Sequence, residues 1–341
     1  MGGIDWSDLT VGDERHPGLV AAVIEGGEIR DRQSCGAETP GGPPLSTASV
    51  LYVASIAKQF TAACVALLVL DGVLGVDDDV RGWIPELPTT WAGVRLVDLL
   101  SHTAGLADSV SADAAGGFAV DRACTTAQRM SLVIAAGRPV DRPGLVHRYA
   151  NHGYVVLASV VERASGRSLG FFAAERIFGP LGMSRTRFLD VPGPPIVPGW
   201  AADGGRVDIA FSCVGDGGLV TCIDDLARWD GWLPTSRLAP RLLSGRPVLP
   251  DGTWAHDAWG ISIRTHHGLR IESHGGAIDG YLASYVRFPE LGTSIVVLAN
   301  TDRWGVEAFG AMVRSFADRL LADRLDLSLP GWDVTHGVPV E

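Results

Sequence analysis

Two short segments near the start of the chain have the length of strands, and the first of them is almost entirely apolar. They cover residues 18–25 and 29–35, and Glu25-Gly26-Gly27-Glu28 joins them. Glycine readily adopts the positive φ angles that a tight hairpin needs. The pattern therefore predicts an antiparallel hairpin at the beginning of the fold.

A helical pattern begins near Ser55. Up to Leu70, apolar side chains recur at positions 60, 63, 64, 67 and 68, and the pattern stops at Asp71-Gly72. This spacing places them on one face of a helix. Similar patterns, separated by Gly and Pro, occur at 94–100, 125–136, 154–165 and 169–177. The segment from 75 to 200 is therefore predicted to be mainly helical.

The last third of the chain returns to strands. We expect helices at 223–233 and 306–322, and strands at 258–265, 270–273, 281–288 and 293–300. Strands at both ends of the chain predict an α+β fold, with an antiparallel sheet flanked by helices plus a mainly helical lobe. We expect a single domain over residues 1–341, in which 15–60 and 205–325 form the α/β lobe and 61–204 the helical lobe.

Composition narrows the class of protein. The chain has 341 residues, of which 46% are hydrophobic and 20% charged, as in a globular protein. The net charge of −11 and the lack of a basic cluster argue against a nucleic-acid partner. The chain start lacks a secretory signal, and no apolar run reaches the roughly 20 residues of a membrane span. We therefore expect a cytoplasmic protein with no membrane partner.

Cysteine usage indicates neither cross-links nor a metal site. The five cysteines, at positions 35, 64, 124, 213 and 222, show neither paired spacing nor a Cys/His ligand pattern. Such spacings are what disulfide frameworks and zinc sites require. We therefore expect reduced thiols, no metal and no cofactor.

Lys58 is the single lysine among the 28 basic residues, and it lies in Ser55-Ile56-Ala57-Lys58. Residues three apart share one face of a helix, which places the Lys58 amine beside the Ser55 hydroxyl. A serine becomes nucleophilic when a neighbouring base takes its proton, and a desolvated lysine can be that base. A capping serine and a surface lysine are the commoner origin of so short a motif. The lack of any other lysine favours the catalytic interpretation.

A second motif is Tyr149-Ala150-Asn151, which we place on a loop after a Pro-Gly turn. Tyr149 can exchange protons as a general acid and base, and the Asn151 amide can orient Lys58 and a substrate carbonyl. On its own, a core tyrosine followed by a turn asparagine is the more common interpretation.

A third motif is Ser273-His274-Gly275-Gly276-Ala277, expected at the end of a strand. Glycines there let a substrate lie against the strand edge. His274 offers a proton donor or a positive charge, and the N–H of Ala277 can form an oxyanion hole with that of Ser55. A lone histidine is usually structural, so this motif gains weight only beside the other two.

In this order, the three motifs resemble the serine β-lactamase and penicillin-binding-protein superfamily, in particular its class C-like branch of esterases, D-aminopeptidases and acyltransferases. Segments at 99–106, 180–183, 217–220, 224–227 and 296–300 are also similar, so the resemblance covers residues 15–325. It implies a β-lactamase/transpeptidase-like fold and no metal or cofactor. The site residues it implies are Ser55 as acylated nucleophile, Lys58 and Tyr149 as acid/base groups, and Asn151, His274, Gly276 and Ala277 as substrate-binding residues.

The chain departs from the superfamily pattern at His274, where β-lactamases and penicillin-binding proteins usually have the lysine of Lys-Thr-Gly. This difference weakens a β-lactamase interpretation, because that lysine helps to bind the antibiotic's carboxylate. His102 lies in Ser101-His102-Thr103-Ala104-Gly105-Leu106 and is interpreted as structural.

The resemblance implies a hydrolase for a small-molecule or peptide acyl substrate, either an ester or an amide, D-amino-acid-containing peptides included. Two alternatives stay open. One is an acyltransferase or peptide cyclase that uses the same acyl-enzyme, and the other is a penicillin-type sensor that stalls at this stage. Loops such as 107–122 and 234–257 would select the acyl acceptor. The oligomeric state is not predicted.

Overall fold

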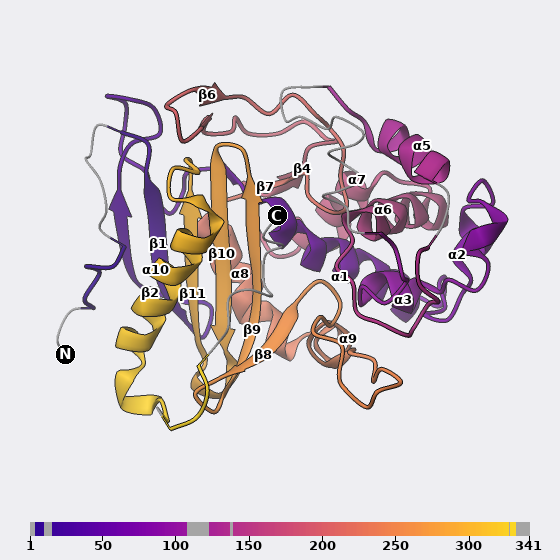
Figure 1. The fold of residues 1–341 in the computed structure, drawn as a ribbon. Helices are drawn as coiled ribbons and strands as arrows, with labels where there is room; N and C mark the ends of the chain where they lie inside the picture. The colour runs from indigo at the N-terminus through magenta and orange to yellow at the C-terminus, as the bar shows by residue number, and fades with distance from the viewer. Residues whose placement is uncertain (1–3, 10–15, 108–122, 137–138, 327, 332–341) are drawn as a thin grey trace.

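The computed structural model describes residues 4–9, 16–107, 123–136, 139–326 and 328–331 (Figure 1). Six strands form an antiparallel sheet in the order β2-β1-β11-β10-β9-β8. These strands are β1 (Leu19–Glu25), β2 (Glu28–Cys35), β8 (Ser262–His266), β9 (Leu269–Ile278), β10 (Tyr281–Phe288) and β11 (Thr293–Ala299). Because β1 pairs with β11, the two ends of the chain share one sheet.

The helices between the two groups of strands gather beside the sheet (Figure 1). α1 (Ala57–Leu70) lies among them and is buried on nearly every side, as expected of a helix that is apolar all round. The others are α2 (Val80–Trp83), α3 (Leu96–Leu100), α5 (Thr126–Ala136), α6 (Asn151–Ser165) and α7 (Leu169–Ala173), which continues into a π-helical turn (Ala174–Phe178).

Helices cover both faces of the sheet, with α10 (Gly305–Leu320) in front of it in Figure 1. Alternate residues of β1 belong to different cores: Leu19, Ala21 and Val23 pack in the core that contains α10. Their neighbours Val20, Ala22 and Ile24 pack in the core that contains α8 (Ile223–Trp232) and the helical region. Side chains of a strand alternate between faces, so a sheet buried on both faces needs continuous apolar strands.

The structure differs from the predicted elements at several boundaries. β9 runs on to Ile278 instead of ending at Ser273, because glycines inside it hide the strand pattern. β8 begins at Ser262 rather than at 258, and α6 begins at Asn151 rather than at Tyr154. Asn151 therefore lies in the first turn of a helix and not on a loop.

Short strands and two short helices were missed, because so few residues carry no pattern. The missed elements are β3 (Leu51–Tyr52), β4 (Arg187–Phe188), β5 (Gly199–Trp200), β6 (Arg206–Val207), β7 (Leu219–Thr221), α2 (Val80–Trp83) and α9 (Ala239–Ser244). β3, β7 and β4 form a second sheet in that order. This small sheet matters for the site below, because it ties the segment before Ser55 to the turn that follows α7.

Three other expectations concern the chain as a whole. None of the helices in the described ranges combines the length and apolar character that a bilayer crossing requires. No disulfide joins any of the five cysteines, all of which are described. The division into two lobes stays a prediction, and residues 108–122 of the loop expected to select the acyl acceptor lie outside the described residues.

Candidate active site

Ser55 lies in a 3-10 turn, η1 (Ala54–Ile56), directly before α1. Ala54 has a φ of +45°, which is uncommon for a residue other than glycine. Such a conformation costs roughly 1–3 kcal/mol and persists only where surrounding structure enforces it. Here Val53 donates its N–H to the carbonyl of Leu219 at 3.1 Å, which anchors the turn to the small sheet.

Lys58 points back from the first turn of α1 toward Ser55. Its Nζ atom lies 2.9 Å from Ser55 Oγ and donates to the carbonyl oxygen of Asp216 at 2.6 Å. The side chain is fully buried. Burial lowers the pKa of Lys58 to about 7; Asp216 and Asp257 oppose this shift, and Arg129 adds to it. A large share of the amine is therefore neutral near pH 7 and able to accept a proton.

Tyr149 lies over the same amine. Lys58 Nζ is 4.9 Å from the centroid of the Tyr149 ring, and that ring is 6.1 Å from the ring of His274. The structure therefore brings together Ser55, Lys58, Tyr149 and His274, although they come from positions more than 200 residues apart.

His102 holds the backbone on both sides of Tyr149. Its carbonyl accepts from the N–H of Arg148 at 2.8 Å, and its Nδ1 accepts from the N–H of Ala150 at 3.2 Å. Its ring packs on Tyr149 with centroids 4.4 Å apart. Burial keeps the pKa of His102 well below its ordinary value, so the imidazole stays neutral and Nδ1 remains an acceptor. These contacts agree with the structural interpretation of His102.

His274 lies inside β9 and is buried. Burial, followed by the charge of Lys58, lowers the pKa of His274 to about 4. Its Nδ1 lies 2.6 Å from the carbonyl oxygen of Gly275, which can only accept a hydrogen bond. Near pH 7 the ring is therefore neutral, with the proton on Nδ1 and an acceptor at Nε2. His274 therefore carries no positive charge at neutral pH. Of the two roles expected from the sequence, a proton donor or a positive charge, the second does not apply at that pH.

Gly276 is required by the close approach of β9 to the turn that carries Ser55. A Cβ atom at this position would lie 2.2 Å from the carbonyl oxygen of Val53 and 3.2 Å from Cβ of Ala54. Contacts of 2.2 Å with backbone are not tolerated. The glycine therefore allows strand and turn to pack directly against each other.

The register of β9 with β10 orients the backbone of Ala277. Ile278 pairs with Tyr281 across the two-residue turn Asp279-Gly280, and Ala277 pairs with Leu282. In antiparallel strands, residues alternate between bonding to the partner and facing away, and the pair that closes a two-residue turn is bonded. Ala277 therefore directs its N–H away from β10, toward the edge of β9 that packs on η1.

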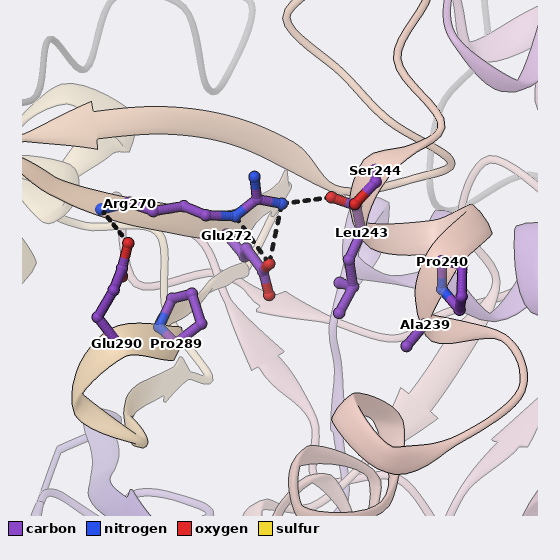
Figure 2. Close-up of a pocket in the computed structure, with 8 residues that line it drawn as sticks. All are labelled: Ala239, Pro240, Leu243, Ser244, Arg270, Glu272, Pro289 and Glu290. Atoms are coloured by element: carbon purple, nitrogen blue, oxygen red, sulfur yellow. Dashed lines mark hydrogen bonds and ion pairs between the residues drawn. The ribbon is translucent and has the colours of Figure 1, made fainter.

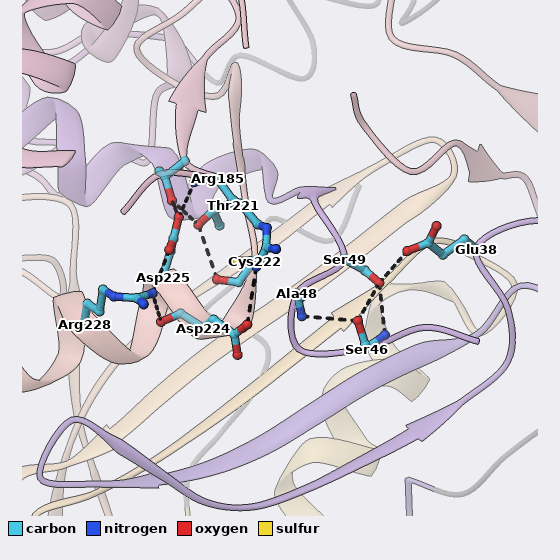
Figure 3. A network of polar contacts seen from close by, with 11 residues as sticks. Glu38, Ser46, Ala48, Ser49, Arg185, Thr221, Cys222, Asp224, Asp225 and Arg228 are labelled. Atoms are coloured by element: carbon cyan, nitrogen blue, oxygen red, sulfur yellow. Dashed lines mark hydrogen bonds and ion pairs between the residues drawn. The ribbon is translucent and has the colours of Figure 1, made fainter. Parts of the chain in front are cut away.

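Two polar networks support the loop that receives Lys58. Gly218 donates its N–H to the hydroxyl of Tyr52 at 2.9 Å, and the Thr61 hydroxyl donates to the carbonyl of Gly215 at 2.8 Å. Farther along, the hydroxyls of Thr186 and Thr221 lie 2.6 Å apart, and the Thr186 hydroxyl donates to the buried carboxylate of Asp225 at 2.9 Å. Arg228 contacts the same carboxylate (Figure 3). The hydrogen bonds of Gly215 and Gly218 fix the backbone on both sides of Asp216, and with it the carbonyl that accepts from Lys58.

Sequence reasoning missed several residues around the site. Asp216 lies in a glycine cluster before a predicted helix, which marks the segment as a turn. The cluster does not reveal that the backbone carbonyl of Asp216 accepts a hydrogen bond from Lys58. Arg129, on α5, lies 3.5 Å from the Asp216 carboxylate. His147 and Asp257 form a hydrogen bond of 2.8 Å between segments that are 110 residues apart. No short sequence motif could have predicted this pair, because the two residues become neighbours only in the folded chain.

A pocket of about 500 Å³ lies elsewhere, between α9, β9 and the turn after β10 (Figure 2). Its charged groups already have partners: Arg270 Nε donates to Glu272 at 3.0 Å, and the Arg270 backbone N–H donates to Glu290 at 3.3 Å. Ser55, Lys58 and Tyr149 are not among its lining residues. We therefore place the candidate active site at Ser55 and not in this pocket.

One group of side chains in the described ranges has the composition of a metal site: His266, His267 and Asp318. It is built by the β8–β9 turn and α10, and not by the elements that carry Ser55. His266 Nε2 and Asp318 Oδ1 are 2.6 Å apart, the distance of a direct hydrogen bond.

The chain is similar to known proteins in sequence and in fold. The model of the family described as Beta-lactamase matches residues 8–316. The chain is 28% identical to a D-aminopeptidase of Cereibacter sphaeroides over 332 residues, which cover 93% of this chain and 61% of that protein. It therefore spans less than two thirds of that relative's length.

Solved structures show the same fold. D-amino acid amidase from Ochrobactrum anthropi SV3, in complex with D-phenylalanine, superposes with a TM-score of 0.76 at 21% identity, over 89% of this chain and 93% of the amidase. An octameric penicillin-binding protein homologue from Pyrococcus abyssi gives 0.75 at 22% identity, over 96% of this chain and 76% of the homologue. The expected β-lactamase/transpeptidase-like α+β fold is confirmed.

Proposed function

Because the chain belongs to the Beta-lactamase family, we propose that it is a serine hydrolase that cleaves amide bonds of D-amino-acid amides or peptides through an acyl-enzyme on Ser55. The buried contact of Lys58 with Ser55 carries this proposal. The names of the similar D-aminopeptidase and D-amino acid amidase support the substrate class.

The first chemical step is acylation. Ser55 Oγ attacks the substrate carbonyl carbon while its proton passes to the neutral amine of Lys58. The N–H groups of Ser55 and Ala277 stabilise the negative charge on the carbonyl oxygen of the tetrahedral intermediate. Tyr149 relays the proton from Lys58 to the leaving amine, and the C–N bond breaks. This leaves an ester on Ser55, with both acid/base groups back in their starting states.

The second step is deacylation by water. Lys58 and Tyr149 take a proton from the attacking water, the ester C–O bond breaks, and the proton returns to Ser55 Oγ. In this proposal Asn151, at the start of α6, orients the substrate carbonyl and Lys58. Because no step changes an oxidation state, the proposal needs no redox cofactor.

The state of His274 favours an amidase or peptidase over a β-lactamase. β-Lactamases and penicillin-binding proteins usually have a lysine at this position of the strand, and that lysine helps to bind the antibiotic's carboxylate. A histidine whose pKa is about 4 is neutral near pH 7 and gives that carboxylate no counter-charge.

The test compares enantiomers. We expect the protein to release ammonia from D-phenylalaninamide or D-alaninamide faster than from the L-amides, and Ser55→Ala to release none. Release from neither enantiomer, together with no covalent adduct on Ser55, would overturn the hydrolase. Release that appears only when an amine acceptor is added would replace it with an acyltransferase.

A further inference from the structure

The hydrogen bond between His147 and Asp257 lies beside the site and has no part in the mechanism above. His147 Nε2 and Asp257 Oδ2 are 2.8 Å apart, and their side chains are 15% and 8% exposed. Burial alone would raise the pKa of Asp257, but the hydrogen bond from His147 brings that pKa well below its ordinary range. The carboxylate is therefore ionised at every pH at which the enzyme would work.

We propose that His147 and Asp257 are positioning residues of the Ser55 site: their bond fixes the segment that carries Tyr149, and the buried carboxylate of Asp257 adds negative charge to the surroundings of Lys58. The inference rests on the proposed function only for its kinetic consequences. Its electrostatic part concerns Lys58 itself and can be measured without turnover.

The positioning half follows from chain connectivity. His147 is two residues before Tyr149, and Asp257 belongs to the segment that leads into β8. The ring of His147 also packs near His102, with centroids 6.1 Å apart, and near His256, at 5.4 Å. The segment before α6 is therefore held by His102 from one side and by Asp257 from the other. Loss of the second contact frees Tyr149 to move relative to Lys58.

The electrostatic half follows from the groups that face Lys58. They are Asp216 from the turn before β7, Arg129 from α5, Tyr149, Tyr154 from α6, His102 after α3, His274 from β9 and Asp257. Asp216 and Asp257 raise the pKa of Lys58, and Arg129 lowers it. Asp257 also acts on His147, His102, His274 and Arg246.

Two variants separate the electrostatic effect of Asp257 from the positioning effect of its hydrogen bond with His147. Asp257→Asn keeps an oxygen that accepts from His147 but removes the charge, so the pKa of Lys58 falls further. His147→Phe keeps the ring volume but removes the donor, so the link is lost while the Asp257 charge stays. Asp318→Asn is the matched control, because it removes the charge of another histidine-bound carboxylate, 2.6 Å from His266.

The first measurement uses the single lysine of the chain. Protein labelled with ¹³C at the lysine Cε gives one signal, that of Lys58, whose chemical shift is followed from pH 5 to 11. We expect a midpoint near 7 in the wild type, a midpoint lower by roughly half a unit or more in Asp257→Asn, and an unchanged midpoint in Asp318→Asn. An unchanged midpoint in Asp257→Asn would overturn the electrostatic half.

The second measurement is the kinetics of the same variants on an activated ester of a D-amino acid. We expect His147→Phe to lower kcat by about tenfold or more with little change in KM, and His147→Gln, which restores an N–H donor, to recover most of the loss. In Asp257→Asn the acid limb of kcat/KM should move to lower pH together with the Lys58 midpoint. Wild-type kcat in His147→Phe would overturn the positioning half. If the wild type forms no Ser55 adduct, the proposed function fails while the titration still decides the electrostatic half.

Discussion

The amine nitrogen of Lys58 lies 2.9 Å from the hydroxyl oxygen of Ser55. This contact joins the only lysine of the chain to a serine in a strained turn, in a place where burial brings the pKa of the lysine to about 7. A proton can therefore pass between the two groups at neutral pH. The predictions below follow from this contact and from the residues that hold it.

Replacing Lys58 by arginine should abolish activity. A guanidinium keeps its proton at any accessible pH and cannot act as the base. We expect kcat/KM for a D-amino-acid ester to fall by about 10²–10⁴, the usual share of general-base catalysis. Because Arg keeps the positive charge, a variant with most of its activity would show that the charge, and not proton transfer, is what Ser55 requires.

Replacing Lys58 by methionine should stabilise the protein most at low pH. Below pH 7 the folded protein buries a protonated amine that the unfolded chain keeps in water, and this penalty disappears only above the ordinary pKa of 10.5. We expect the free energy of unfolding at pH 6 to rise by about 1–4 kcal/mol, with a smaller gain at pH 9. A gain that is larger at pH 9 than at pH 6 would contradict the lowered pKa. Thermal melts at both pH values give the comparison.

Removing the hydroxyl of Tyr149 should slow acylation without unfolding the protein. We expect Tyr149→Phe to lower kcat by about 10²–10⁴. Tyr154→Phe is the matched control, because its ring also lies near Lys58, at 5.7 Å, but its hydroxyl donates to the carbonyl of Leu100. That variant should lose about 1 kcal/mol of stability and little activity. Equal kinetic losses in both would remove Tyr149 from the proton relay.

A methyl group at Gly276 should push β9 away from the turn of Ser55. Gly276→Ala would place Cβ 2.2 Å from the carbonyl oxygen of Val53, so the backbone must shift. We expect a loss of about 1–3 kcal/mol in stability and a clear fall in the rate of Ser55 acylation. Gly82→Ala is the control, because a Cβ atom at this position on α2 has open space. It should lower neither the stability nor the rate of Ser55 acylation. Wild-type acylation in Gly276→Ala would show that the close approach does not matter.

The sequence was most informative where pattern and chemistry are local. The β1–β2 hairpin, α1 and the Ser55–Lys58 contact depend on neighbours within a few residues, and each was predicted. β9 was predicted too short because Gly275 and Gly276 look unlike strand residues, although the close packing on Val53 explains why position 276 needs a glycine. A propensity cannot reveal a contact with a segment 200 residues away.

Contacts between distant segments that lie outside the three motifs were not predicted, for the same reason. No sequence feature near His147 or Asp257 predicts the hydrogen bond between them. The neutral state of His274 depends on its burial and on the nearby charge of Lys58, which also follow only from the fold. The three motifs contain Ser55, Lys58, Tyr149 and His274, which the structure brings together. Their charge states and supporting contacts came only from the fold.

The central claim is that Ser55 forms an acyl-enzyme that water then resolves. The most direct measurement is the intact mass of the wild type and of Ser55→Ala, after brief and after long exposure to an activated D-amino-acid ester. We predict one acyl group on the wild type that decays with time, and none on Ser55→Ala. Equal labelling of the two proteins, or turnover by the wild type with no adduct at any time, would contradict it.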